Sequence, residues 1–140
     1  MPWRGPREPG EDPTLGWAVI DWIEQHCVVP DGDRAGAAFV LTDEQARFIL
    51  QHYRLEPDAE VVAGKASSAW RYRRSLLVRP QKWGKGPLTA AMICAESVGP
   101  VLFDGWDAAG EPVGRPWPTP WVQVAASSED QTAHVYRALL

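Results

Sequence analysis

The chain has 140 residues, of which 45% are hydrophobic and 23% charged, and this composition is that of a globular protein with one buried core. No apolar run is long enough to span a bilayer, and residues 1–12 lack the apolar stretch of a secretion signal. The formal net charge of −4 argues against a general affinity for nucleic acid, and we expect a cytoplasmic protein with a disordered lead-in over residues 1–12.

Residues 13–57 are predicted to form an N-terminal helical segment of two helices. The first begins at Asp12-Pro13, because proline suits the first helical turn, and its apolar residues recur at helical spacing. The second begins at Thr42, which is followed three residues later by Gln45 in the pattern of a capping box. Glu56-Pro57 is expected to end this helix.

The two cysteines, Cys27 and Cys94, stand alone without a CxxC spacing. His26 precedes Cys27, but no second ligand pair follows that would complete a tetrahedral zinc site. We therefore expect a helix-end histidine beside a buried cysteine, and neither a zinc site nor a disulfide framework.

Residues 58–140 alternate between extended and helical patterns. Strands are predicted over 59–63, 70–78, 101–103 and 121–126, helices over 87–98 and from Ser128 onward, and a Gly- and Pro-rich loop or hairpin over 105–120. This order predicts an α/β fold with a parallel sheet, preceded by the two helices. The chain ends inside the last helix, so we expect a fragment or a truncated gene product.

Charge is distributed unevenly along the chain. Residues 61–95 contain no acid, and their basic residues are Lys65, Arg71, Arg73, Arg74, Arg79, Lys82 and Lys85. A basic segment inside an acidic protein is typical of a specific anion site, although a solvated basic strand edge has the same composition.

The segment that follows the 70–78 strand has the parts of a phosphate-binding loop. A strand aims the loop, Gly84 allows the backbone to approach an anion closely, and the helix that follows presents its positive end. Lys85 is placed to reach the β- and γ-phosphates of a nucleotide. Against the pattern GxxxxGK[ST], however, Arg79 replaces the first glycine and Gly86 replaces the final Ser/Thr. The alternative is a basic strand–helix turn in which the glycines serve only the turn.

Three segments in this order resemble those of tailed-phage terminase large subunits. Residues 76–87, LLVRPQKWGKGP, resemble the Walker A segment of that family, which often replaces the first glycine. Residues 41–50, LTDEQARFIL, resemble its adenine-binding segment, and residues 122–133, VQVAASSEDQTA, resemble its second core strand and the helix that follows.

The resemblance implies a partial P-loop NTPase core over residues 58–140 that binds ATP with Mg²⁺. It implies Lys85 and Arg79 as catalytic residues, with Lys85 on the phosphates and Arg79 stabilising the transition state. The residues implied in nucleotide binding are Gln45, Gln81, Lys82, Trp83, Gly84, Lys85 and Gly86.

The whole family enzyme hydrolyses ATP to drive viral DNA into a procapsid, and its nuclease domain cuts concatemeric DNA. The resemblance therefore implies double-stranded viral DNA, a portal protein and a small terminase subunit as partners. It also implies a homo-oligomeric motor in the host cytoplasm, transiently bound at the procapsid.

This chain departs from the family pattern at the metal site. Gly86 has no hydroxyl for Mg²⁺, and no apolar run ending in Asp-Glu follows, so the Walker B acids are absent and the metal ligands are unassigned. We expect this chain alone to bind ATP weakly and not to hydrolyse it; Asp104 and Asp107 are the first candidates for a replacement acid. A helicase-like P-loop motor and a non-catalytic remnant are the alternative interpretations.

Single residues also have alternatives. Gln45 is explained equally by its capping box and by adenine recognition, and a side chain bonded to Thr42 cannot fully serve both. Arg79 either acts on the γ-phosphate or joins the loop to a neighbouring acid. Trp83 either covers the nucleotide or packs under the loop.

Overall fold

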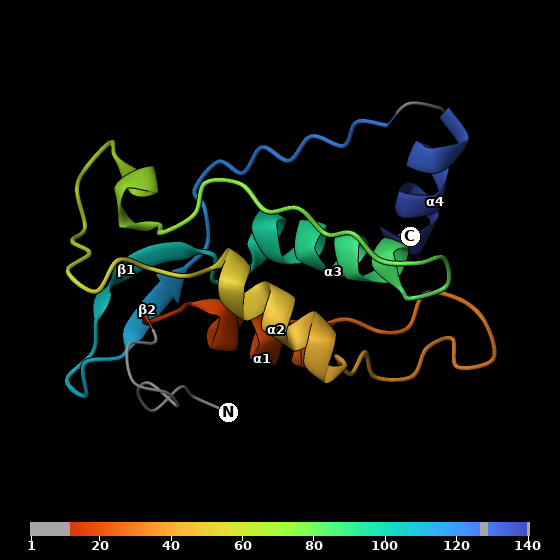
Figure 1. Cartoon of the computed structure of the whole chain (residues 1–140), viewed down its shortest axis with the longest axis horizontal. Coiled ribbons are helices and arrows are strands. Elements are labelled where there is room, and N and C mark those ends of the chain that lie inside the picture. Colours follow the sequence, from red (N-terminus) through yellow and green to blue (C-terminus); the bar gives the residue numbers. More distant parts are fainter. Residues whose placement is uncertain (1–11, 127–128, 140) are drawn as a thin grey trace.

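The computed structural model describes residues 12–126 and 129–139. Within these residues the helices are α1 (Gly16–His26), α2 (Asp43–His52), α3 (Lys85–Val98) and α4 (Glu129–Leu139), with a short 3₁₀ helix, η1 (Ala66–Ala69). The strands are β1 (Leu102–Trp106) and β2 (Pro112–Arg115). Figure 1 shows α1 and α2 on one side of α3, extended chain along the other side, and the β-hairpin near the end of α3.

The core lies where α1 packs against both α2 and α3, and α4 packs against α3 as well. Apolar residues at helical spacing on α1 supply one wall, Ile49 of α2 a second, and Leu88 of α3 a third. The buried hydrophobic residues on α1, α2 and α3, with Leu15 just before α1, are Leu15, Val19, Ile20, Ile23, Ile49, Leu88, Ala90, Ala91 and Ala95. Burial of these apolar side chains is the main contribution to the stability of the fold. The small alanines of α3 also let the helices approach closely.

Helix α1 begins at Gly16, later than the Asp12-Pro13 start that the sequence predicts. The preceding residues bond across to the end of α2 instead: the Leu55 amide donates to the Pro13 carbonyl at 2.8 Å, and the Leu15 amide donates to Tyr53 at 3.1 Å. Thr14 accepts from the Gly16 amide and donates to the Leu50 carbonyl, which joins the start of α1 to α2.

Helix α2 begins as predicted. Thr42 Oγ1 accepts from the Gln45 amide at 3.3 Å, and Gln45 Oε1 accepts from the Thr42 amide at 3.0 Å, which confirms the capping box. The helix ends at His52 rather than at Glu56-Pro57, because Arg54 and Leu55 form β-bridges with other segments.

The β-hairpin follows α3. Strand β1 covers the predicted 101–103 strand in part, and β2 lies in the 105–120 segment for which a loop or hairpin is predicted. The strands are antiparallel, with Leu102 opposite Arg115, and the register shifts before Trp106, where Gly105 has a φ of +103°. A glycine is required there, because other residues rarely adopt that φ.

The strands predicted over 59–63, 70–78 and 121–126 are not formed. These segments lack regular strand pairing, apart from a bridge between Trp70 and Leu55 and a bond from the Arg71 amide to the Arg54 carbonyl. A strand needs a neighbour to pair its amides and carbonyls along its length, and among the described residues no strand pairs with these segments. Leu76 and Val78 are accordingly 86% and 70% exposed. The parallel α/β sheet therefore stays a prediction.

The tryptophans divide into two groups. The simplest prediction from the sequence places Trp17, Trp22, Trp70, Trp117 and Trp121 in the core. The first four pack against the core. Trp121 is instead 90% exposed, because no other segment covers it.

Helix α4 lies within the helix predicted from Ser128 onward. Ser128 itself lies outside the described residues, as do residues 1–11 of the lead-in predicted over 1–12. None of the helices in the described part of the chain combines the length and apolar character that crossing a bilayer requires.

A half-buried acid joins the end of α2 to α3. The Tyr53 hydroxyl donates to Glu96 Oε1, and the Trp117 indole also bonds to the Glu96 carboxylate. Burial raises the pKa of Glu96, and the hydrogen bonds from Tyr53 and Trp117 only partly offset this effect.

Stability should therefore depend on the protonation of Glu96. A folded-state pKa above the unfolded value of about 4.3 means that the folded protein binds more protons, so its stability falls as pH rises between the two values. We expect Glu96→Gln to remove this dependence and to be more stable than wild type at neutral pH, measured by urea unfolding across pH 4–8. Parallel pH profiles for the two proteins would contradict it.

Gly16 is the point of closest approach between α1 and α2. A Cβ on Gly16 would lie 2.6 Å from the Leu50 Cα, whereas a Cβ on Gly86 would meet nothing within 4 Å. We expect Gly16→Ala to lower the free energy of unfolding by about 1–3 kcal/mol. The matched control, Gly86→Ala, should be neutral or stabilising by about 0.5–1 kcal/mol, because alanine favours the helix. Equal unfolding midpoints for the two variants would refute this packing.

Candidate functional site

The predicted phosphate loop, residues 79–86, connects the extended segment 71–78 to α3 and lies at the end of α3 away from the β-hairpin (Figure 1). Two of its residues have positive φ, +62° at Lys82 and +98° at Gly84. Gly84 adopts this conformation without strain, whereas Lys82 is a less usual occupant. The two turns bend the chain sharply, and α3 begins at Lys85, two residues before the predicted start.

The Lys85 side chain folds back over the loop. Its Nζ donates to the Arg79 carbonyl at 2.6 Å and to the Pro80 carbonyl at 2.7 Å. An ammonium group has three N–H bonds, so one remains after these two contacts. Lys85 thus closes the loop on itself and places its charge at the N-terminus of α3.

The backbone next to Lys85 offers further donors. The amides of Lys85 and Gly86 belong to the first turn of α3, where N–H groups have no acceptor within the helix. Pro87 follows them and has no N–H group to leave unpaired. Free amides, the positive end of a 14-residue helix and a lysine ammonium together form an arrangement suited to an anion.

Glu44, in the first turn of α2, binds two loop side chains. Trp83 Nε1 donates to Glu44 Oε2 at 2.8 Å, and Arg79 Nε lies 3.5 Å from the same oxygen. The Arg79 guanidinium also lies 5.5 Å from the centre of the Trp83 ring. Of the two interpretations of Arg79, the structure contains the contact with a neighbouring acid, and Trp83 packs partly against the core.

Gln45 lies against the loop although it is far from it in sequence. A Cβ on Gly84 would be 3.0 Å from Gln45 Nε2, so this amide group touches the turn before α3. Gln45 is 7% exposed, and its Oε1 is occupied by the Thr42 amide. The structure thus unites the predicted adenine-binding and phosphate-binding segments, with Nε2 as the atom of Gln45 that faces the loop.

The remaining predicted site residues lie at the loop surface. Gln81 and Lys82 are exposed, and Gly86 is partly exposed with open space around it. A nucleotide that contacts all three residues would have to approach the loop from its solvent side.

The two acids suggested as replacements for a Walker B acid are not at the loop. Asp104 pairs with Arg115 at 3.0 Å, and Asp107 Oδ1 accepts from the amides of the hairpin turn. Figure 1 places the hairpin at the opposite end of α3 from the loop. Across the described residues no cluster of three His, Cys, Asp or Glu side chains is arranged to hold a metal ion.

Sequence reasoning missed Glu44 as a partner of the loop. An acid in the first turn of a helix is already explained by its favourable interaction with the helix dipole. The separation of 39 residues between Glu44 and Trp83 gives no indication of a contact.

The capping box makes Gln45 a structural residue before any ligand is considered. We expect Gln45→Ala to lower the free energy of unfolding by about 1–2 kcal/mol, since it removes a helix cap and a buried side chain. Gln45→Glu preserves the cap acceptor and should retain most of the stability. Urea unfolding of both variants measures the difference; if alanine cost no more than glutamate, the cap would contribute nothing.

Two phage proteins are similar to this chain over most of its length. The Gene 13 protein of Mycobacterium phage L5 is 35% identical over 141 residues, and the Gene 13 protein of Mycobacterium phage D29 is 34% identical over 141 residues. Each match covers 88% of this chain and 22% of the phage protein, so the chain spans about a fifth of the length of these relatives. No family model matches the chain. No solved structure is significantly similar to it.

Proposed function

We propose that this chain is the N-terminal part of a tailed-phage terminase large subunit and that its 79–86 loop binds the phosphates of ATP. The observation that carries the proposal is the position of Lys85, whose ammonium folds over the loop beside the first-turn amides of α3. A lysine at a helix N-terminus, next to backbone donors, suits the β- and γ-phosphates of a nucleotide.

Phosphate binding would replace hydrogen bonds that Lys85 already makes to loop carbonyls. Lys85 Nζ has one unused N–H and can release a loop carbonyl to gain a charged acceptor, which makes a stronger hydrogen bond. Mg²⁺ would be held mainly by phosphate oxygens and water, since Gly86 supplies no hydroxyl.

Arg79 could reach the γ-phosphate only after leaving Glu44. The two side chains are 42% and 62% exposed, and an ion pair this exposed contributes roughly 0–1 kcal/mol. A phosphate therefore competes easily for Arg79, and Glu44 holds the arginine near the loop until a nucleotide arrives.

Gln45 supports an adenine contact through one atom. Its Oε1 closes the α2 cap, so only the Nε2 group, which faces Gly84, would be left to donate to a ring nitrogen of the base. The cap and the base contact can then coexist in part, with the amide orientation fixed by Thr42.

Two extended segments support the sheet that the resemblance implies. Figure 1 shows residues 75–78 and 122–125 running in the same direction along α3, as parallel strands joined by a helix would run. They do not pair with each other in the described structure, so strands from elsewhere would have to complete such a sheet.

The similarity to two phage proteins supports the phage setting. Because the chain spans about a fifth of those relatives, the further activities belong to a larger polypeptide: ATP-driven packaging of double-stranded DNA, and cleavage of concatemers. Contacts with a portal protein and a small subunit, assembly of a homo-oligomeric motor, and location in the host cytoplasm and at the procapsid are part of the same proposal.

Substitution of Lys85 and of Lys82 tests which of the two lysines binds the phosphates. Loss of a charge-assisted hydrogen bond to phosphate should cost roughly 1.5–3 kcal/mol, or about ten- to a hundredfold in affinity. We expect Lys85→Ala to weaken ATP binding by that factor, measured by calorimetric titration with Mg²⁺ present, and the matched Lys82→Ala to have a much smaller effect.

The opposite result would assign phosphate binding to Lys82 instead of Lys85. If Lys82→Ala lost ATP binding while Lys85→Ala bound like wild type, the loop would use its earlier lysine, and Gly84-Lys85 would be only a turn. Failure of the folded wild-type chain to bind ATP at millimolar concentration would argue for a basic strand–helix turn.

A further inference from the structure

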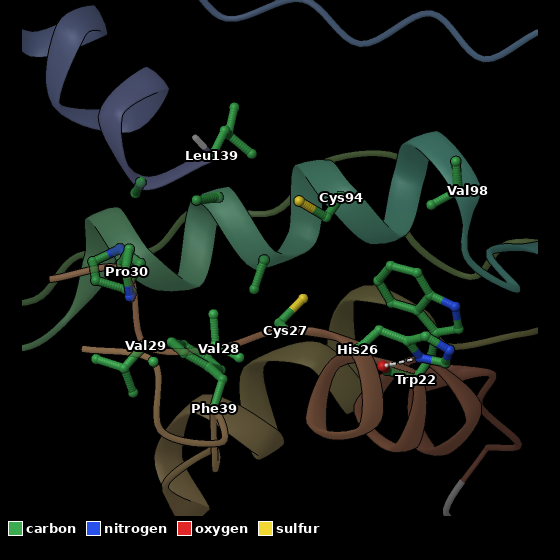
Figure 2. Close-up of a pocket in the computed structure, with 15 residues that line it drawn as sticks. Trp22, His26, Cys27, Val28, Val29, Pro30, Phe39, Cys94, Val98 and Leu139 are labelled. Carbon is green, nitrogen blue, oxygen red and sulfur yellow. Dashed lines mark hydrogen bonds between the residues drawn. The ribbon is translucent and has the colours of Figure 1, made fainter. Parts of the chain in front are cut away.

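A cavity of about 440 Å³ lies beside α3, along one face of the helix from Pro87 to Val98. The end of α1, the loop that follows it, α3 and the end of α4 enclose the cavity, and most of its lining is apolar. Both cysteines of the chain, Cys27 and Cys94, line it. Figure 2 shows the two side chains on the cavity wall, with the Cys27 sulfur pointing toward α3.

The backbone holds each cysteine in place. Cys27 caps the C-terminal end of α1: its amide donates to the Ile23 carbonyl at 2.8 Å, and its carbonyl accepts from the Phe39 amide at 3.2 Å. Cys94 lies on α3, against which α1 packs. The packing of two helices therefore sets the distance between the two thiols.

The two thiols border the same cavity. Both are free and half-buried, and Figure 2 shows the Cys27 sulfur directed toward α3, the helix that carries Cys94. Burial, and then the neighbouring Cys94, raise the pKa of Cys27 to about 11. Cys27 is consequently protonated at neutral pH and slow to react by itself.

We propose that Cys27 and Cys94 are a redox-active pair that forms a reversible intramolecular disulfide between the end of α1 and the middle of α3. Both thiols line the same cavity, and a disulfide requires the sulfur atoms to approach to about 2.05 Å. The apolar cavity provides the approach for a small disulfide reagent and the space for the side chains to turn.

The exchange reaction needs an external disulfide, such as oxidised glutathione. The Cys94 thiolate attacks one glutathione sulfur, a mixed disulfide forms, and one glutathione thiolate leaves and takes up a proton. The Cys27 thiolate then attacks the Cys94 sulfur, the protein disulfide forms, and the second glutathione leaves as a thiol. Two cysteine thiols are oxidised, and one glutathione disulfide is reduced to two thiols.

The mixed disulfide favours the second step. Once Cys94 carries glutathione it can no longer ionise or hydrogen-bond as a thiol, so two of the causes that raise the pKa of Cys27 disappear and burial alone remains. The first exchange thus removes the smaller causes of the raised pKa of Cys27, and burial, the largest cause, remains.

The test uses the whole chain in glutathione buffers of increasing oxidised fraction, quenched with acid and mapped by mass spectrometry without reduction. We expect one tryptic species that joins the Cys27 and Cys94 peptides and has lost two hydrogens, at a yield independent of protein concentration. The oxidised chain should also unfold at a temperature higher by on the order of 10 °C, because the bond closes a long loop.

Cys27→Ser and Cys94→Ser are the matched controls. Each should stop at a mixed disulfide or a free thiol and show no rise in unfolding temperature on oxidation. Peptide mapping of the wild-type protein tests for the Cys27–Cys94 disulfide even if a variant folds poorly. Wild-type protein that carries only mixed disulfides, or only disulfides between chains, would overturn the proposal, and ATP titration of the oxidised chain reports separately on the loop.

Discussion

The buried amide of Gln45 lies between the first turn of α2 and the turn that leads into α3, and the neighbouring contacts depend on its position. Its Oε1 closes the cap of α2, and its Nε2 touches Gly84. The residue before it, Glu44, holds Trp83 and Arg79 from the same helical turn. The loop is therefore placed by the start of α2 as much as by α3 itself. The buried Oε1 of Gln45 is tolerated because it accepts a hydrogen bond from the Thr42 amide.

Helix α3 has two unlike sides. On one side α1 packs against α3 and against α2, with Gly16 allowing α1 to approach the α2 backbone and Tyr53 bonding to Glu96. Along the other side run extended segments whose apolar residues, among them Leu76 and Trp121, stay exposed. Helix α4 also packs against α3.

The contacts of the loop differ in strength in a way that suits ligand exchange. The cap of α2 and the core under Trp83 are partly or fully buried and keep the loop in position. The ion pair of Arg79 and the carbonyl contacts of Lys85 are exposed to water and therefore weak. An incoming anion could replace the weak contacts without disturbing the buried ones. The pair formed by Cys27 and Cys94 acts on the same helix from another side, where α1 meets α3.

Local chemistry was readable from the sequence wherever the determining residues are close together. The Thr42–Gln45 capping box, the helix after Gly84 and the turn-rich hairpin depend on neighbours within a few residues, and the structure contains all three. Strands over 70–78 and 121–126 were wrongly expected within this chain, because β-propensity does not supply the partner strand that pairing requires.

The contacts that define the site and the thiol pair depend on tertiary structure. Glu44 contacts Trp83 across 39 residues, and Cys27 borders the same cavity as Cys94 across 67, separations that no motif spacing encodes. The sequence by itself determined the capping box that begins α2 and the presence of helices near the predicted positions, although α1 begins later and α3 earlier than predicted. The packing of α1 and α2 on α3 decided which side chains touch, because burial of apolar surface selects one arrangement of helices and brings their polar residues together as a consequence.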